Sequence, residues 1–324
     1  MTPDLPFLAD ELVGQSPAAV QLRDLVRRAA PLEGGVLLVG ESGVDVAAVA
    51  RDIHDRSHPS VHPWCRLACA EGDPAGHDRA IFGAPVSQDD DLVSVTEGSL
   101  IAAARGGTLF LQDVTELPAG LQARLARAFR DGEVRLAGAD VPIAIRLMAS
   151  ALPSIDEDLR TRRFRHDLYR RLAVSRIDLP PLRERTADIA PLAERLVKDI
   201  CQAASRPAPA LTHAAQALLA AVAWPRNLAG LKGALERIVP MVDGPAIQIE
   251  HLLAVLPIER PAPSFTPAGT LRDARARFER EYIGAVLRHH AWQLGDAART
   301  LGIQRPNLYR KARQLGIPLA KQSA

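Results

Sequence analysis

The residues best placed to do chemistry follow a short apolar run near the amino end. Gly40, Glu41, Ser42 and Gly43 come directly after GVLLV at 35–39 and before apolar residues at helical spacing. A glycine-bearing turn between a buried strand and a helix is the scaffold of a phosphate-binding loop, in which backbone N–H groups surround an anion. The spacing therefore predicts such a scaffold, and on its own this signal is weak.

Further apolar runs predict the elements that must position this loop. Strands are expected at 35–39, 108–111 and 143–149, with helices at 44–56 and around 121–129. This alternation predicts an α/β fold with a parallel sheet covered by helices on both faces. Residues 187–204 and 213–256 are expected to be purely helical.

Two long segments resemble one protein family. ARGGTLFLQDVTELPAGLQARLARAF at 104–129 and RRFRHDLYRRLAVSRIDLPPLRERTADI at 162–189 closely resemble the AAA+ domain of bacterial enhancer-binding proteins, which remodel sigma-54 RNA polymerase. LVGQSPAAVQLRDLVRRAA at 12–30 is similar too, so the resemblance covers nearly the whole chain. It implies an AAA+ parallel-sheet domain of the P-loop type, a helical lid subdomain and a small all-α helix-turn-helix domain.

These features predict four regions. An AAA+ α/β subdomain is expected at 1–184 and a helical lid at 185–256. A linker with four prolines is expected at 257–270, since proline stiffens the backbone and removes hydrogen-bond donors. A helix-turn-helix domain is expected at 271–324. Only about a dozen residues precede Leu12, and we expect no receiver or ligand-sensing domain among them.

The loop departs from the Walker A motif of the family. Where the family reads GESGTGKE, this chain reads GESGVDVA, so Val46 replaces the nucleotide-gripping lysine and Asp45 replaces a glycine. Losing a charge-assisted hydrogen bond to phosphate costs about 1.5–3 kcal/mol. The Asp45 carboxylate also brings a negative charge toward any bound anion.

Three further nucleotide-handling motifs are degenerate. The Walker B sequence LFLDE becomes LFLQD, which puts Gln112 and Asp113 at the positions of the Mg²⁺-binding and hydrolytic acids. The sensor asparagine aligns with Ala151, and the lid arginine aligns with Ala229. We therefore expect no catalytic residue, no required cofactor and an inactive ATPase. The remaining loop backbone, Gly40 to Gly43, is compatible with weak ATP or ADP binding.

The family's sigma-54-contacting loop is also missing. After Ile81-Phe82-Gly83 the chain reads APVSQDDDLV, with no GAFTGA sequence. We therefore expect no contact with sigma-54, and interpret this stretch as a solvated surface loop.

Two arginines of the family motif remain. Arg165 and Arg171 occupy the positions of the arginine fingers that reach a neighbouring subunit's nucleotide site, where a guanidinium stabilises charge on phosphate. Two interpretations stay open. The arginines either complete a paralogue's active site in a mixed ring, or only make salt bridges at a subunit face.

Basic charge is concentrated at the carboxyl end. From Leu271 onward the chain has 11 Lys or Arg residues against 4 Asp or Glu residues, a net charge of +7 within an overall +2. The preceding 270 residues therefore carry −5. A basic module attached to a mildly acidic body is typical of nucleic-acid binding.

Residues 278–317 resemble the Fis-type helix-turn-helix. Phe278, Tyr282, Ala285 and Val286 form an apolar stripe, Gly302 is expected at the turn, and Ile303 is expected to fill the core. The second helix is expected to read DNA, as a dimer with half-sites ~34 Å apart. Base contacts are predicted for Gln304, Arg305 and Asn307, and mainly phosphate contacts for Tyr309, Arg310, Lys311 and Arg313.

Composition argues against a disulfide-stabilised protein and against a membrane-spanning one. The three cysteines form no disulfide framework, no apolar run is long enough for a membrane span, and we expect a cytoplasmic protein. Cys65 and Cys69 form one isolated Cys-x₃-Cys pair, whereas a strong zinc signal consists of two spaced pairs, so no metal is expected.

The leading hypothesis is a regulator that binds double-stranded DNA at a promoter or enhancer and self-associates as a dimer or ring. It would act as a repressor, an atypical activator or a modulator of a paralogous AAA+ regulator, with RNA polymerase as another candidate partner. Two alternatives stay open: a working sigma-54 activator ATPase with compensated motifs, and an interaction subunit that donates arginine fingers.

Overall fold

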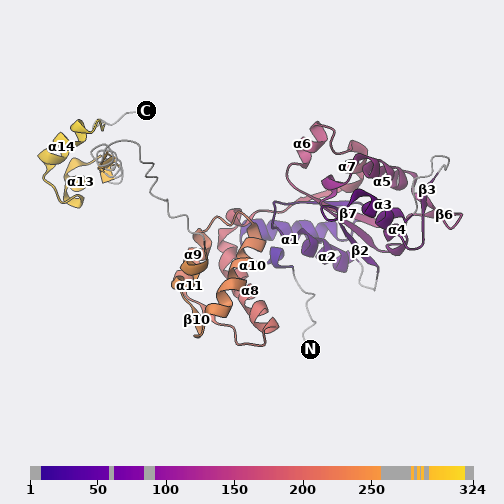
Figure 1. Cartoon of the computed structure of the whole chain (residues 1–324), viewed down its shortest axis with the longest axis horizontal. Coiled ribbons are helices and arrows are strands. Elements are labelled where there is room, and N and C mark those ends of the chain that lie inside the picture. The colour runs from indigo at the N-terminus through magenta and orange to yellow at the C-terminus, as the bar shows by residue number, and fades with distance from the viewer. Residues whose placement is uncertain are drawn as a thin grey trace. The chain divides into compact units, whose positions relative to one another are not determined.

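The structure is a computed structural model that describes residues 9–57, 62–83, 92–256, 279–280, 283–284, 286–287 and 292–317 (Figure 1). The chain divides into two compact units, Met1–Pro257 and Ile258–Ala324, and each is described by itself.

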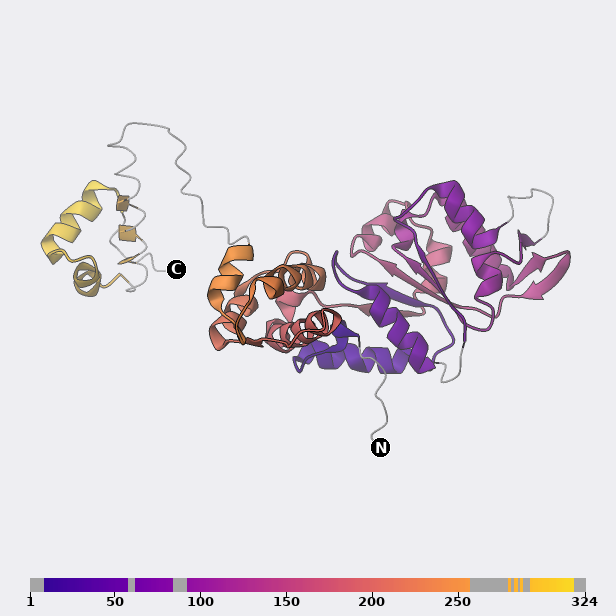
Figure 2. The ribbon, with the colours of Figure 1, turned by 60° about the horizontal axis from the view of Figure 1, so that its bottom comes forward.

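A five-stranded sheet forms the centre of the α/β part of the first unit (Figure 2). The strand order is β2-β4-β7-β1-β8 and every pair is parallel. The strands are β1 Val36–Val39, β2 Trp64–Ala68, β4 Thr108–Gln112, β7 Arg146–Ala151 and β8 Ser175–Asp178. Because the strands are parallel, the carboxyl ends of β1, β4 and β7 meet at one edge. The predicted parallel α/β sheet is confirmed.

Helices cover both faces of the sheet, as predicted. Side chains alternate along a strand, so Leu37 and Val39 of β1 pack into one apolar cluster and Val36 and Leu38 into another. The first cluster includes residues of α3 Pro74–Phe82, α5 Ala119–Asp131 and α7 His166–Leu172, and the second includes residues of α1 Pro17–Ala29 and α2 Val46–Ser57. The two groups of helices lie on opposite sides of the sheet in Figure 1.

Short polar residues begin two of these helices. The Ser16 hydroxyl accepts a hydrogen bond from the Ala19 N–H (3.1 Å), and Pro17 follows at the first helical position. The Asp73 carboxylate caps α3 in the same way, accepting from the Gly76 N–H (2.6 Å). Each such cap stabilises a helix by about 0.5–2 kcal/mol.

The third predicted strand begins later than expected. The prediction placed it at 143–149, whereas β7 starts at Arg146 and continues to Ala151. Residues 143–145 instead leave a hairpin, where the Ile143 N–H donates to the Gly132 carbonyl (2.8 Å). The hairpin belongs to a smaller sheet of β3 Val93–Val95, β5 Glu133–Leu136 and β6 Ala139–Pro142. Helices α4 Leu100–Ala103 and α6 Ile155–Arg160 and the 3₁₀ helices η1 Asp10–Leu12 and η2 Val114–Glu116 complete this part.

The lid subdomain is mainly helical but not purely so. It contains η3 Leu182–Glu184, η4 Thr186–Asp188, α8 Ile189–Ala203, α9 His213–Ala221, α10 Asn227–Ile238, η5 Val239–Met241 and α11 Ile249–Val255. The strands β9 Ala210–Leu211 and β10 Ala246–Ile247 form a short parallel pair. The helical prediction for 187–204 is therefore confirmed by η4 and α8, whereas the purely helical prediction for 213–256 was wrong because that range contains β10. Pro207, Pro209 and Pro245 precede these strands and cannot donate the backbone hydrogen bonds that a helix needs.

The second unit has a small apolar core. Helices α13 Leu294–Thr300 and α14 Arg305–Gln314 pack with the described helical residues 279–280, 283–284 and 286–287, and Ile283, Leu287 and Leu308 are buried in this core. Val286 packs against this core, whereas Phe278, Tyr282, Ala285 and the linker at 257–270 lie outside the described residues.

One core prediction in this unit was wrong. Ile303 is 36% exposed, because its N–H closes the end of α13 on the Ala298 carbonyl (3.0 Å), while Ile283, Leu287 and Ile317 fill the core. No described helix is long and apolar enough to cross a membrane.

Candidate functional site

The glycine-bearing loop lies at the carboxyl edge of the sheet, where ligands of open α/β folds bind. It leaves β1 at Gly40 and enters α2 at Val46, as the strand–turn–helix pattern predicts. The Gly40 N–H donates to the Ala151 carbonyl (3.1 Å), so the loop begins directly beside the end of β7.

Val46, which stands where the family's Walker A motif has a lysine, contributes no charge to this loop. Val46 is only 8% exposed and packs with Val44 and Val49 in the apolar cluster beneath the loop. A hydrophobic side chain at this point is stabilised by burial and offers no donor to a phosphate.

The ends of β4 and β7 also lack a metal-binding acid at the expected place. Gln112 accepts a hydrogen bond from the Arg66 guanidinium (2.5 Å). Asp113 lies beyond the strand with left-handed backbone (φ +57°), and its N–H donates to the Ser150 hydroxyl (2.9 Å). Burial, with a smaller contribution from the Glu116 charge, raises the pKa of Asp113. Ala151 is buried at the end of β7 and carries no polar group.

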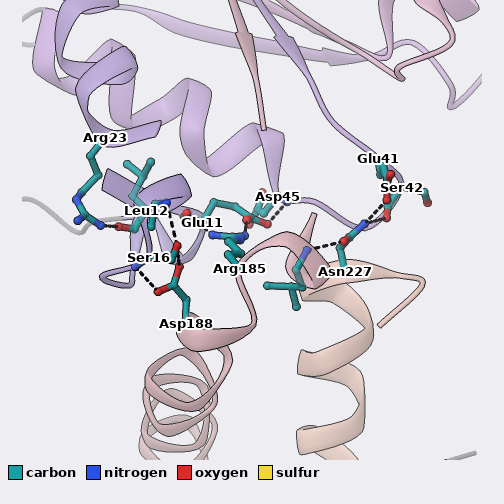
Figure 3. A network of polar contacts seen from close by, with 12 residues as sticks. Glu11, Leu12, Ser16, Arg23, Glu41, Ser42, Asp45, Arg185, Asp188 and Asn227 are labelled. Atoms are coloured by element: carbon teal, nitrogen blue, oxygen red, sulfur yellow. Dashed lines mark hydrogen bonds and ion pairs between the residues drawn. The ribbon is translucent and has the colours of Figure 1, made fainter. Parts of the chain in front are cut away.

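The lid closes directly on the loop (Figure 3). Asn227 at the start of α10 donates to the Ser42 carbonyl (3.0 Å), and its own carbonyl oxygen accepts from the Leu182 N–H (3.0 Å). Ala229, at the lid-arginine position, contributes its backbone N–H to the Gly43 carbonyl (2.9 Å). The lid therefore contacts the loop through backbone and amide groups.

An ion pair and a close backbone approach also link the loop and the lid. Arg183 of η3 makes two hydrogen bonds of 2.6 Å to the Glu41 carboxylate. Gly43 has φ +83°, and a Cβ there would lie 2.1 Å from the Arg226 carbonyl oxygen, so a glycine is required. Neither Asn227 nor Arg183 was predicted as a site residue, although Asn227 lies two positions before Ala229 and Arg183 lies in the family-like segment at 162–189.

A buried charged cluster lies on the other side of the loop. Glu11 of η1 accepts a hydrogen bond from the Asp45 N–H (2.9 Å) and forms an ion pair with Arg185. Glu11 and Arg185 are almost completely buried. Burial raises the pKa of the Glu11 carboxyl, and the adjacent guanidinium opposes this effect. Neither residue was predicted, because nothing in the local pattern distinguishes them from surface charges.

The two finger-like arginines lie on the surface of the described chain. Arg165 precedes α7 and pairs with Asp167 through two hydrogen bonds (3.0 and 2.6 Å), which holds the pKa of that carboxyl below its usual range. Arg171 lies at the other end of α7, is exposed, and reaches the Arg130 carbonyl at 3.4 Å. Their role toward another subunit stays a prediction.

In the second unit, the predicted DNA-reading residues gather on one helix face. Gly302 has φ +66° at the turn, as expected, while Leu308 and Ala312 face the core. The predicted DNA-contacting side chains that are exposed are Gln304, Arg305, Asn307, Tyr309, Arg310 and Arg313. Lys311 differs from them, because its ammonium group pairs with Glu279 at 3.0 Å.

The cysteine and histidine residues near β2 have ordinary roles. His62 bonds the Gly106 carbonyl and His77 bonds the Glu71 carbonyl. Burial raises the pKa of the Cys69 thiol to about 12. Among the described residues no group of three or more His, Cys, Asp or Glu side chains could hold a metal ion.

The glycine-bearing loop, the parallel sheet, the lid and the appended helix-turn-helix together define an AAA+ regulator with a DNA-binding domain. Residues 12–178 match the sigma-54 interaction domain, residues 183–264 the AAA+ ATPase lid domain, and residues 274–315 the Fis family of bacterial regulatory proteins. The chain belongs to the family of sigma-54-dependent transcriptional regulators.

Individual relatives agree with this assignment. The chain is 32% identical to the response regulator protein PilR of Pseudomonas aeruginosa, over 95% of this chain and 70% of the relative. It is 33% identical to the regulator AlgB of Pseudomonas putida, covering 95% and 68%. The Nif-specific regulatory protein of Klebsiella pneumoniae is 32% identical over 93% of this chain, which spans 58% of that relative's length.

Solved structures of NtrX from Brucella abortus are similar to this chain. The crystal structures in complex with ADP and with ATP each have a TM-score of 0.68 and 29% identity, covering 94% of this chain and 69% of theirs. At the corresponding positions of the present chain, Val46 and the Gln112 amide do not fit the roles of a phosphate-binding cation and an anionic Mg²⁺ ligand, since one is apolar and the other uncharged.

Proposed function

We propose that this chain is a DNA-binding transcriptional regulator whose AAA+ unit does not hydrolyse ATP. The observation that carries this proposal is the burial of Val46 in the apolar cluster beneath the loop. Since the lysine ammonium that would grip the phosphates is absent, and Asp45 adds a negative charge at the loop, affinity for ATP or ADP is weak. No cofactor is required for the regulator to act.

The hydrolytic step lacks its chemical groups as well. Gln112 is an uncharged amide bonded to Arg66, so it does not supply the anionic ligand that Mg²⁺ prefers. Asp113 leaves the strand in a left-handed conformation, and its side chain is one methylene shorter than the hydrolytic glutamate of the family.

DNA binding is supported by the second unit. An exposed face carrying Arg305, Arg310 and Arg313 lies opposite the buried Leu308 and Ala312. Arginine and asparagine side chains form bidentate hydrogen bonds with guanine and adenine, and basic residues bind phosphate. Self-association as a dimer or ring would place two such helices on one duplex.

Regulation without hydrolysis takes one of three forms: repression, activation without sigma-54, or modulation of an active paralogue. The chain has no GAFTGA sequence, and the residues that replace it, 84–91, lie outside the described residues. We infer that the chain does not open sigma-54 promoters by itself.

The decisive experiment combines two measurements on one preparation of the full chain. Steady-state phosphate release from ATP should stay at the buffer background with and without DNA, while a footprint on promoter DNA should show protection. Steady ATP turnover by the wild-type chain would instead establish a working activator with compensated motifs. Loss of the footprint in an Arg305→Ala variant would assign the protection to α14.

A second candidate function rests on the exposure of Arg165 and Arg171 at the two ends of α7. Guanidinium groups at these family positions could complete the nucleotide site of a competent paralogue in a mixed ring. Mixing the chain with such a paralogue should then change the paralogue's ATPase rate. The double variant Arg165→Ala and Arg171→Ala should abolish that change, whereas Arg160→Ala, an exposed arginine of α6, should preserve it.

A further inference from the structure

Glu11 is a completely buried carboxylate beside the amino end of α2 (Figure 3). It lies in η1, 34 residues before its hydrogen-bond partner Asp45 in the sequence, and approaches the loop from the side opposite Asn227. A buried carboxylate is strongly destabilising unless its charge and lone pairs are compensated.

The compensation comes from the loop and from the lid. One Glu11 oxygen accepts from the Asp45 N–H at 2.9 Å, and the other pairs with the Arg185 guanidinium. Arg185 also donates to the Glu11 backbone carbonyl (2.6 Å). The Glu11 carboxylate therefore joins the glycine-bearing loop to Arg185, which lies between η3 and η4.

Three neighbouring N–H groups, of Val44, Val46 and Ala48, also donate within the chain. The Val44 N–H donates to the Glu41 carbonyl (3.2 Å) and the Val46 N–H to the Val44 carbonyl (2.9 Å). The Ala48 N–H donates to the Asp45 carboxylate (3.0 Å). In a phosphate-binding loop, N–H groups at such positions point toward the anion.

We infer that the Glu11 carboxylate takes the place of a nucleotide phosphate as the anion at the amino end of α2. The lid is then held on the loop without nucleotide, by Glu11 with Arg185 on one side and by Asn227 and Ala229 on the other. This inference deepens the proposed function, on which it rests, because it gives the degenerate AAA+ unit a closed structure that needs no ligand.

Amide hydrogen exchange at Asp45 tests this inference in the full chain purified without nucleotide. The Asp45 N–H of the wild-type protein should be protected, and adding ADP with Mg²⁺ should leave its exchange rate unchanged. Glu11→Gln keeps the shape of the side chain but removes its charge. A charge-assisted hydrogen bond is about twice as strong as a neutral one, so exchange at Asp45 should rise about tenfold, equivalent to ~1.4 kcal/mol.

Asp10→Asn is the matched control. Asp10 lies in the same 3₁₀ helix but pairs with Arg195 (2.9 Å), so this variant should leave Asp45 exchange unchanged. An Asp45 amide that exchanges freely without nucleotide and becomes protected by ADP would overturn the inference. If Glu11→Gln fails to fold, the exchange of the Asp45 amide in the wild-type chain, with and without ADP, still tests the role of Glu11.

The two hypotheses fail in different ways. A freely exchanging Asp45 amide in a chain without ATPase activity would contradict the role of Glu11 and leave the proposed function intact. Steady ATP hydrolysis by the chain would contradict the proposed function, whether or not the Asp45 amide is protected without nucleotide.

Discussion

Arg183 and Glu41 form a bidentate ion pair, with two N···O distances of 2.6 Å, between the lid and the glycine-bearing loop. The two residues are 142 positions apart in the sequence. A planar guanidinium matches the two oxygens of a carboxylate, so the pair fixes the orientation of both groups.

The pH dependence of this ion pair is the first prediction. Hydrogen bonding from Arg183 holds the pKa of Glu41 below its ordinary value. Such a carboxylate stabilises the folded state at pH values above its unfolded pKa, and the effect is lost as the pH falls through the lower folded pKa. The wild-type thermal unfolding midpoint should therefore exceed that of Arg183→Gln near neutral pH, and the difference should disappear in acid.

Salt provides the control for that measurement. The pair is partly exposed, so high ionic strength should reduce the difference between the two proteins. A difference that persists unchanged in acid would show that Arg183 acts through packing instead.

The second prediction concerns Asp188, which is buried between the lid and the start of α1. It accepts hydrogen bonds from the N–H groups of Gln15 and Ser16 (both 2.8 Å) and from the Ser16 hydroxyl (2.5 Å). Asp188→Ala should lower the free energy of unfolding by about 3 kcal/mol or more, because each unsatisfied buried group costs about 1–3 kcal/mol. Urea unfolding measures this loss.

Asp199→Asn provides the comparison for Asp188. Asp199 is exposed and lies 3.9 Å from Arg195, so its substitution should change stability by less than about 0.5 kcal/mol. Equal losses in the two variants would refute the role assigned to Asp188.

The third prediction concerns the close approach of the loop to the lid. Gly43→Ala forces a left-handed backbone on alanine and places Cβ 2.1 Å from the Arg226 carbonyl oxygen. The free energy of unfolding should fall by at least ~1–3 kcal/mol. Gly233→Ala, in the interior of α10 with open space around it, should instead stabilise the chain by about 0.4–1 kcal/mol. Calorimetry of both variants tests the contrast.

The fourth prediction separates sequence reading from phosphate binding on α14. Asn307→Ala should cost about 1–3 kcal/mol on the preferred DNA and relax the preference at one base pair. Arg313→Ala should weaken binding to all sequences and reduce the slope of affinity against salt by about one. Titrations of two DNA sequences at several salt concentrations distinguish these effects.

Lys311 should behave differently from Arg313. Its ammonium group is paired with Glu279 in the structure, so phosphate binding must compete with that ion pair. Lys311→Ala should therefore reduce DNA affinity less than Arg313→Ala. The reverse order would show that the Glu279 pair does not compete.

The local pattern of apolar residues was sufficient to predict the main strands and helices. The apolar runs of β1 and β4 are short, continuous and buried on both faces, which is the signature of strands within a parallel sheet. Leu308 and Ala312, four residues apart and so on one side of a helix, both lie on the buried face of α14. The short β9–β10 pair was missed, since two-residue strands carry no detectable period.

The sequence by itself determined that Val46 and Gln112 stand where the family has its lysine and acid, because a motif is contiguous and residue type is read directly. Only the tertiary structure decided which groups surround the loop. Glu11, Arg185 and Asn227 come from segments up to 186 positions from the loop residues they serve, and meet there only after the lid folds back on the sheet. A charged residue destined for burial has the same letter as one on the surface, and its partner is defined by packing rather than by local periodicity.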